Sequence, residues 1–126
     1  ACTNSSFADQ YELGGAYAPI CDFDLLMAAV ESAKELGVKM PVGNLYSSDT
    51  FYDDAASLAV WQKMGVLAIE MESAALYMNA ARSGKKALAI CTISDCPLAG
   101  GEECTAFERE QTFNKMIEIA LEAADE

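Results

Sequence analysis

Three apolar segments of the chain are each followed by residue types that carry out acid–base chemistry or bind polar ligands. Hydroxyl and aromatic side chains occupy residues 43–52, Glu70-Met71-Glu72 ends the second segment, and Thr92-Ile-Ser-Asp95 ends the third. Carboxyl groups can transfer protons and accept hydrogen bonds, and an aromatic ring can stack on a flat ligand. If the segments are parallel strands, their carboxyl ends share one edge of the sheet, where ligands of such folds bind.

Each of these residues also has a purely structural explanation. Glu70 and Glu72 would favour the positive N-terminus of the helix that follows them. Asp95 would be an ordinary turn residue, and Phe51 and Met71 would pack in the core. The residue types alone leave both explanations open.

Arg109 is one of only two arginines in the chain. The sequence places it in the first turn of the last helix, where a cation is mildly unfavourable. An arginine in that position suggests a carboxylate partner, and Asp95 is the obvious candidate across the intervening loop. Because the chain has no histidine, Ser-His and Cys-His nucleophile pairs and His-ligated metal sites are excluded.

The elements that would position these residues alternate between helix and strand. Apolar residues recur at helical spacing after Asp22, and Gly37 ends that pattern. Short apolar runs between turn residues are typical of buried parallel strands. We expect strands at 1–3, 38–45, 66–69 and 87–93, a loop at 4–15, and helices at 22–36, 53–64, 72–83 and 105–124, the last opened by a capping box at 105–108. This order predicts an α/β fold with a mostly parallel sheet flanked by helices.

Length and composition limit the number of domains, the kinds of partner and the cellular compartment that we expect. The chain has 126 residues, of which 52% are hydrophobic. We therefore expect residues 1–126 to form a single domain. A net charge of −12 argues against nucleic acid or an anionic membrane as partner. No apolar run approaches the about 20 residues of a membrane span. The five cysteines, an odd number without a CxxC pair, are expected to be reduced thiols in a cytoplasmic protein.

Five segments occur in one order and at fitting separations that together resemble the bacterial, hexameric (DeoD-type) purine nucleoside phosphorylases. They are Ala18-Pro-Ile-Cys-Asp-Phe-Asp-Leu25, Val42-Gly-Asn-Leu-Tyr-Ser-Ser-Asp-Thr-Phe-Tyr52, Ile69-Glu-Met-Glu-Ser-Ala-Ala75, Cys91-Thr-Ile-Ser-Asp95 and Phe107-Glu-Arg-Glu-Gln-Thr-Phe-Asn-Lys-Met-Ile117. The Glu-Met-Glu segment is shared with uridine phosphorylases and methylthioadenosine/adenosylhomocysteine nucleosidases, whereas the longer segments point to the purine branch.

The resemblance implies a three-layer α/β/α sandwich and reversible phosphorolysis of a purine nucleoside to the base and ribose 1-phosphate. It implies that Asp95 donates a proton to the purine, assisted by Arg109, and that Ser94 orients Asp95. Glu72 would accept hydrogen bonds from the ribose hydroxyls, and Met71 would press against the sugar.

The resemblance also implies that Phe51 stacks on the purine, and that Glu70 is a weaker candidate near the base or sugar. It implies no cofactor and no metal, with phosphate as co-substrate, and a homo-oligomer such as the hexamer of relatives. Only the carboxyl-terminal part of the family is matched, without its phosphate-binding residues. We therefore expect this chain alone to be inactive unless another chain supplies the other half. A nucleosidase of the same superfamily and a non-catalytic nucleoside-binding or assembly fragment remain alternatives.

Overall fold

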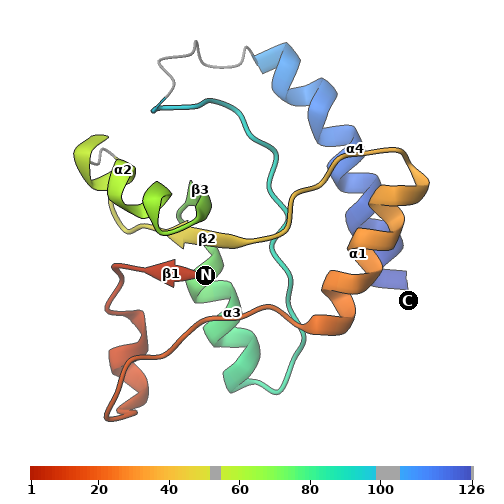
Figure 1. The fold of residues 1–126 in the computed structure, drawn as a ribbon. Helices are drawn as coiled ribbons and strands as arrows, with labels where there is room; N and C mark the ends of the chain where they lie inside the picture. Colours follow the sequence, from red (N-terminus) through yellow and green to blue (C-terminus); the bar gives the residue numbers. More distant parts are fainter. Residues whose placement is uncertain (52–54, 99–105, 126) are drawn as a thin grey trace. The chain divides into compact units, whose positions relative to one another are not determined.

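The computed structural model describes residues 1–51, 55–98 and 106–125, with side chains from 56 and 113 onward in the last two ranges. The described chain separates into two compact units. Unit 1 comprises residues 1–21 and 42–87, and unit 2 comprises residues 22–41 and 88–126. The elements follow in the order β1 (Cys2–Thr3), η1 (Phe7–Tyr11), α1 (Phe23–Glu35), β2 (Asn44–Ser47), α2 (Ala55–Lys63), β3 (Val66–Glu70), α3 (Ser73–Arg82) and α4 (Ala106–Asp125) (Figure 1).

Unit 1 contains a parallel three-stranded sheet in the order β1-β2-β3. The predicted α/β class with a parallel sheet and flanking helices is therefore confirmed. In the register of the sheet, Thr3 pairs with Ser47 and Ser47 pairs with Glu70. Because these residues are the last of their strands, the three carboxyl ends lie level at one edge of the sheet.

Helices α2 and α3 pack on opposite faces of β2. The ring of Tyr46 stacks on Trp61 of α2 with centroids 4.4 Å apart. The next residue, Ser47, instead accepts a hydrogen bond from the Ala74 amide of α3 at 3.1 Å. Successive side chains of a strand point to opposite faces, so the two helices cover the two sides of β2, as Figure 1 shows.

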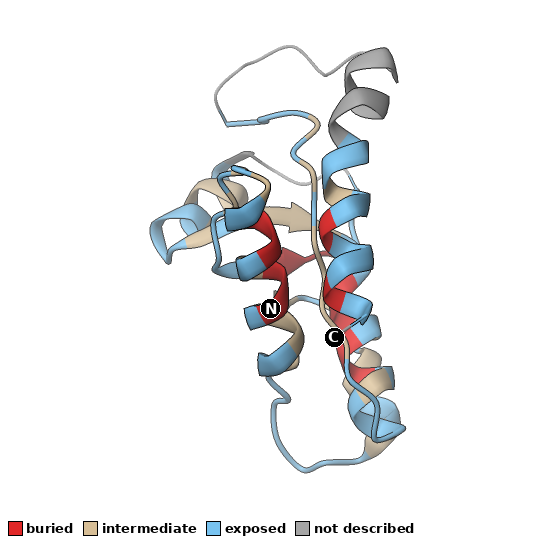
Figure 2. Ribbon diagram, turned by 90° about the vertical axis from the view of Figure 1, so that its right-hand side faces the viewer, coloured by how far each residue is buried: buried red, intermediate tan, exposed pale blue. Residues whose placement is uncertain are grey.

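Unit 2 is built around a small core between α1 and α4. The side chain of Asp22 accepts a hydrogen bond from the Leu25 amide at 2.9 Å, which satisfies one of the free donors at the start of α1. Gly37, with a φ of 67°, follows the helix in the left-handed conformation that favours glycine. The buried hydrophobic residues of the two helices are Ala28, Ala29, Ala33, Ile119 and Ala123, and Figure 2 shows buried stretches of the chain in red.

Two strand predictions were wrong, and the same core explains both. The predicted strand at 38–45 is confined to Asn44–Ser47, because Val38 and Met40 pack against the unit 2 core instead of joining the sheet. The predicted strand at 87–93 does not form, and Leu88 and Ile90 pack against that core as well. An apolar run indicates burial, but it does not say whether a sheet or a pair of helices provides it.

The remaining predicted elements fare better. The predicted strands at 1–3 and 66–69 correspond to β1 and β3, and the helix at 72–83 corresponds to α3. The predicted loop at 4–15 contains the short 3-10 helix η1. Two predictions fall on or next to residues outside the described ranges. They are the start of a helix at Asp53 or Asp54 and the capping box at 105–108. None of the helices within those ranges combines the length and apolarity needed to cross a membrane.

The four cysteines in the described ranges, Cys2, Cys21, Cys91 and Cys96, form no disulfide there. Cys2 lies in β1, where its thiol donates to the Leu45 carbonyl with a sulfur–oxygen distance of 3.3 Å. Burial raises the pKa of the Cys2 thiol above its usual range. Cys2 is therefore a neutral hydrogen-bond donor between two strands.

Candidate active site

The carboxyl edge of the unit 1 sheet is fastened by hydrogen bonds between neighbouring strands and loops. The Thr3 hydroxyl donates to the Ser47 carbonyl at 2.6 Å, and the Ser48 amide donates to the Glu70 carbonyl at 2.8 Å. Just beyond the strands, the Asp49 amide donates to the Asn4 side-chain oxygen at 2.9 Å. The segments that follow β1, β2 and β3 are thereby held together at one edge.

Glu70 ends β3 and accepts hydrogen bonds from the first residues that follow the strand. Its Oε2 atom accepts from the Glu72 amide at 2.7 Å and from the Ser73 amide at 2.6 Å. Its Oε1 atom accepts from the Ser73 hydroxyl. The N-terminus of α3 carries free amide donors and a partial positive charge, so the Glu70 carboxylate is well matched to this position.

Met71 and Glu72 form an exposed bend between β3 and α3, which we call the 71–72 bend. The Met71 amide donates to Glu72 Oε2 at 3.1 Å. Within the described ranges, the other carboxylate oxygen of Glu72 has no hydrogen-bond partner. The side chain of Met71 is 40% exposed. The bend thus offers a carboxylate oxygen and a thioether to a ligand.

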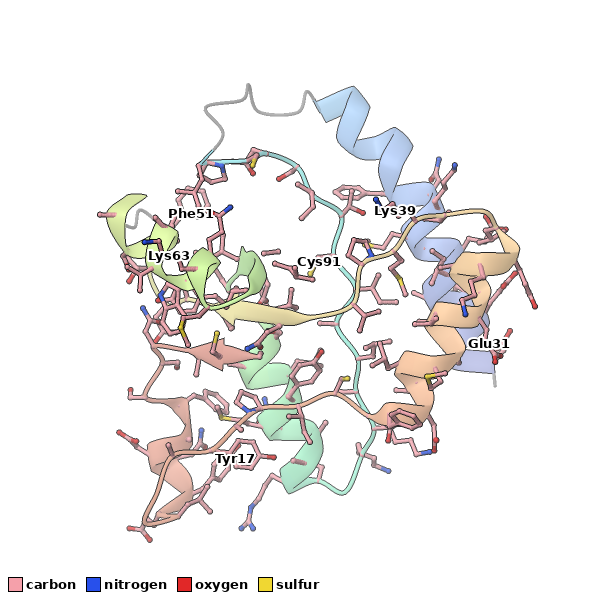
Figure 3. All side chains as sticks on the ribbon, in the orientation of Figure 1. Tyr17, Glu31, Lys39, Phe51, Lys63 and Cys91 are labelled. Atoms are coloured by element: carbon pink, nitrogen blue, oxygen red, sulfur yellow. The ribbon has the colours of Figure 1, made fainter. Side chains whose placement is uncertain are left out.

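Phe51 lies after a compact turn that begins directly behind β2. The Ser48 hydroxyl accepts a hydrogen bond from the Thr50 amide and donates to the Thr50 carbonyl, both at 3.0 Å. The ring of Phe51, labelled in Figure 3, is 74% exposed. An aromatic ring of this exposure has a face on which a flat ligand can stack.

Asp95 and Ser94 lie in unit 2, on the segment between the core-packing residues 88–90 and the region before α4. The Ser94 hydroxyl donates to Asp95 Oδ1 at 3.0 Å. That Ser94 orients Asp95 for catalysis stays a prediction. Upstream, the Thr92 hydroxyl donates to the Met116 sulfur at 3.3 Å, which connects the segment to α4. Asp95 itself is exposed.

The structure therefore groups the predicted residues by unit. Unit 1 brings Phe51, Glu70 and the 71–72 bend to the carboxyl ends of β2 and β3. Unit 2 places Ser94 beside Asp95. Arg109 belongs to α4 in unit 2, but its side chain falls outside the described part, so its predicted pairing with Asp95 stays a prediction.

Sequence reasoning did not single out the residues that brace this edge. Ser47 and Ser48 are both buried, and each uses its side-chain oxygen to hold a neighbouring backbone group. Asn4 does the same for the turn behind β2. The available signal was a pair of serines at the end of β2, where an unsatisfied buried hydroxyl would be costly.

Over the described ranges, no group of three or more cysteine, aspartate or glutamate side chains is arranged to hold a metal ion. At the sheet edge, the Glu70 carboxylate instead accepts from amide and hydroxyl donors of the protein itself, and the Glu72 carboxylate accepts from the Met71 amide.

Comparison with known proteins shows the family of the chain. Residues 3–126 match the protein family that is described as "Phosphorylase superfamily". The chain belongs to the phosphorylase superfamily. Within it, the chain is similar to proteins described as "Purine nucleoside phosphorylase DeoD-type". The Geobacillus sp. (strain WCH70) protein is 50% identical over 124 residues, which are 98% of this chain and 52% of that protein.

Two further DeoD-type relatives give the same picture. The Clostridium novyi protein is 50% identical over 99% of this chain and 54% of its own length. The Yersinia enterocolitica protein is 48% identical over 98% of this chain and 51% of its own length. This superfamily member therefore spans about half the length of the relatives that it matches.

Proposed function

We propose that this chain is the base- and ribose-binding part of a purine nucleoside phosphorylase, corresponding to the carboxyl-terminal half of that enzyme. The observation that carries the proposal is the 50% identity to a DeoD-type enzyme along 98% of this chain. The geometry supports it, because the Glu-Met-Glu segment and Phe51 lie at the carboxyl ends of neighbouring parallel strands, where ligands of such sheets bind.

The 71–72 bend binds the sugar in this proposal. Glu72 accepts hydrogen bonds from the ribose hydroxyls through the carboxylate oxygen that has no partner in the described structure. Met71, partly exposed beside it, presses against the apolar face of the sugar ring. Hydrogen bonds to a carboxylate are stronger than those between neutral groups, so Glu72 contributes most of the sugar recognition.

Phe51, Ser94, Asp95 and Arg109 hold and protonate the purine in this proposal. Phe51 stacks on the ring system, and Asp95 donates a proton to N7 of the departing base. Ser94, which already donates to Asp95 Oδ1, leaves the other oxygen to carry the proton, and Arg109 assists the transfer. The predicted contact of Glu70 with base or sugar stays a prediction, since its carboxylate faces the start of α3.

The reaction balances with these groups. A phosphate oxygen forms a bond to C1′ while the bond from C1′ to N9 breaks and its electron pair passes to the purine. Positive charge develops on the sugar and negative charge on the base, as in other glycosyl transfers. The proton from Asp95 neutralises the base, and a general acid of this kind contributes about 10²–10⁴-fold in rate. The proton that hydrogen phosphate loses on forming the bond to C1′ passes to solvent, from which Asp95 is protonated again.

The other half of the enzyme supplies the phosphate pocket in this proposal. Phosphate is the co-substrate, and no cofactor takes part. The complete enzyme is a cytoplasmic homo-oligomer, with the hexamer as the proposed assembly. This chain by itself carries out no phosphorolysis, because a nucleoside bound at the sheet edge meets no positioned phosphate.

The test uses a hybrid in which this chain replaces the matching half of the Geobacillus sp. relative. With inosine and phosphate, the hybrid should release hypoxanthine and ribose 1-phosphate in equal amounts, whereas the purified 126-residue chain should release neither. Free ribose in place of ribose 1-phosphate would establish the nucleosidase alternative. Binding of inosine or adenosine without any cleavage by the hybrid would favour a non-catalytic binding fragment.

A further inference from the structure

We infer that Glu70 is a positioning residue, which fixes the backbone of Glu72 so that its carboxylate meets the ribose hydroxyls. This inference rests on the proposed function, because it assigns to Glu70 an indirect role in sugar recognition. The sequence suggested that Glu70 lies near the base or sugar. In this inference Glu70 instead acts through Glu72.

The Glu70 carboxylate accepts hydrogen bonds from the residue that it is proposed to position and from the residue after it. One carboxylate oxygen, Oε2, accepts from the Glu72 amide at 2.7 Å and from the Ser73 amide at 2.6 Å. The other oxygen accepts from the Ser73 hydroxyl. The carboxylate therefore bridges the end of β3 and the start of α3, with the 71–72 bend enclosed between the two.

Both sides of the bend are also anchored to β2. The Ser48 amide donates to the backbone carbonyl of Glu70 at 2.8 Å, which fixes the residue before the bend. The Ala74 amide donates to the buried Ser47 hydroxyl at 3.1 Å, which fixes the chain after it. With both ends held, the Glu70 carboxylate determines where the peptide of Glu72 lies between them.

The neighbouring carboxylates consequently have different environments. Glu70 is partly buried and accepts three hydrogen bonds, so it has little capacity left for a ligand. Glu72 is exposed, and its carboxylate accepts only from the Met71 amide within the described ranges. One glutamate is thus committed to the bend, and the other is presented by it.

The experiment measures sugar selectivity in the hybrid, as the ratio of kcat/KM for inosine to that for 2′-deoxyinosine. Glu72→Gln should lower this ratio by about 10-fold, the effect of losing a charged hydrogen-bond partner. Glu70→Ala should lower the ratio by a similar factor, since a displaced Glu72 contacts the 2′-hydroxyl less well. In a Glu72→Gln background, Glu70→Ala should leave the ratio unchanged, because the residue that it positions is already disabled.

Two further variants separate positioning from a general loss of stability. Glu70→Gln keeps an oxygen that can accept from the Glu72 and Ser73 amides, so it should hold the ratio within about twofold of the unsubstituted hybrid. Glu31→Gln makes the same change on the exposed side of α1 (Figure 3) and should alter nothing. If Glu70→Ala fails to fold, Glu70→Asp must show the lowered ratio, because its carboxylate is one methylene shorter.

The outcomes distinguish this inference from the proposed function. Equal losses for inosine and 2′-deoxyinosine in the Glu70 variants would mean that Glu70 only caps α3, and would overturn the inference while phosphorolysis stands. A further drop of the ratio in the double variant would overturn it as well. No cleavage of either nucleoside by the unsubstituted hybrid would contradict the proposed function, and the inference with it.

Discussion

The 71–72 bend of unit 1 and the segment around Asp95 in unit 2 carry the two carboxylates of the proposed mechanism, but the structure supports them very differently. The bend lies between a strand and a helix, and Glu70, Ser47 and Ser48 hold both of its ends. Asp95 lies on an exposed segment without helix or strand, where the adjacent Ser94 donates to it.

This difference shows which parts of the candidate site are built locally. The 71–72 bend, which is proposed to bind the sugar, is supported by β2, β3 and α3, all of which lie in unit 1. The segment that carries Asp95 packs against the core between α1 and α4 through Leu88 and Ile90, and its described residues join no strand of the sheet. Asp95, the proposed proton donor, therefore has less local support than Glu72, the proposed sugar ligand.

Replacement of the proton donor should have the largest effect. In the hybrid, Asp95→Asn removes the ionisable proton while keeping the size and the hydrogen bond from Ser94. The value of kcat/KM for inosine should fall by about 10²–10⁴-fold, the usual contribution of a general acid. Initial rates at saturating phosphate measure this, with Asp125→Asn, on the exposed end of α4, as the matched control. A loss below threefold would refute the role of Asp95.

Replacement of the sugar-binding carboxylate should have the next largest effect. Glu72→Gln in the hybrid should reduce kcat/KM for inosine by about 10–100-fold, since hydrogen bonds to a charged group contribute about 1.5–3 kcal/mol each. The same variant should lose less on 2′-deoxyinosine, which lacks one of the hydroxyls. Equal losses on both substrates would place Glu72 away from the ribose.

The local support of the bend can be tested in the purified chain. Ser47 is 3% exposed, so Ser47→Ala leaves the Ala74 amide without its acceptor and should lower the free energy of unfolding by about 1–3 kcal/mol. Trp61 is the only tryptophan and stacks on Tyr46 of unit 1, so its fluorescence in urea reports on this unit.

The matched control for this measurement is Ser83→Ala, at the exposed end of α3. It should change the urea midpoint far less than Ser47→Ala does. Identical midpoints for the two serine variants would show that the hydrogen bond from Ala74 to Ser47 does not brace the bend.

The smallest effect is expected at the base-stacking ring. Phe51→Ala in the hybrid should raise KM for inosine by about 2- to 10-fold, because an aromatic contact of this kind contributes about 0.5–1.5 kcal/mol. Phe51→Tyr, which keeps the ring, should restore KM. Steady-state kinetics of the three proteins decide the point, and a Phe51→Ala variant with an unchanged KM would remove Phe51 from the site.

The sequence predicted the helices of both units and strands β1 and β3 of unit 1 better than the apolar segments of unit 2, for physical reasons. Strong local signals define the helices, such as the Asp22 cap of α1 in unit 2 and Gly84 behind α3 in unit 1, and parallel strands must align their carboxyl ends. The apolar residues of 38–40 and 88–90 carry no comparable signal, because they are equally suited to a sheet and to the core between α1 and α4. Tertiary packing decided their structure.

Within the candidate site, the residue types indicated which chemistry is possible but not which of the two glutamates is presented to a ligand. Glu70 and Glu72 are identical in sequence terms, yet one caps α3 while the other is exposed on the bend. That division depends on which carboxylate reaches the first amides of α3, a matter of backbone direction that spacing does not determine. The bracing by Asn4 and Ser47 joins segments more than 25 residues apart, so no local pattern indicates it.

The central claim, that Asp95 protonates the departing purine, is tested most directly by a substrate that needs no proton. 7-Methylinosine already carries a positive charge on its base, so its base departs without help from an acid. In the hybrid, we predict that Asp95→Asn loses about 10²–10⁴-fold in kcat/KM on inosine but stays close to the unsubstituted hybrid on 7-methylinosine. Equal losses on the two nucleosides would contradict the account.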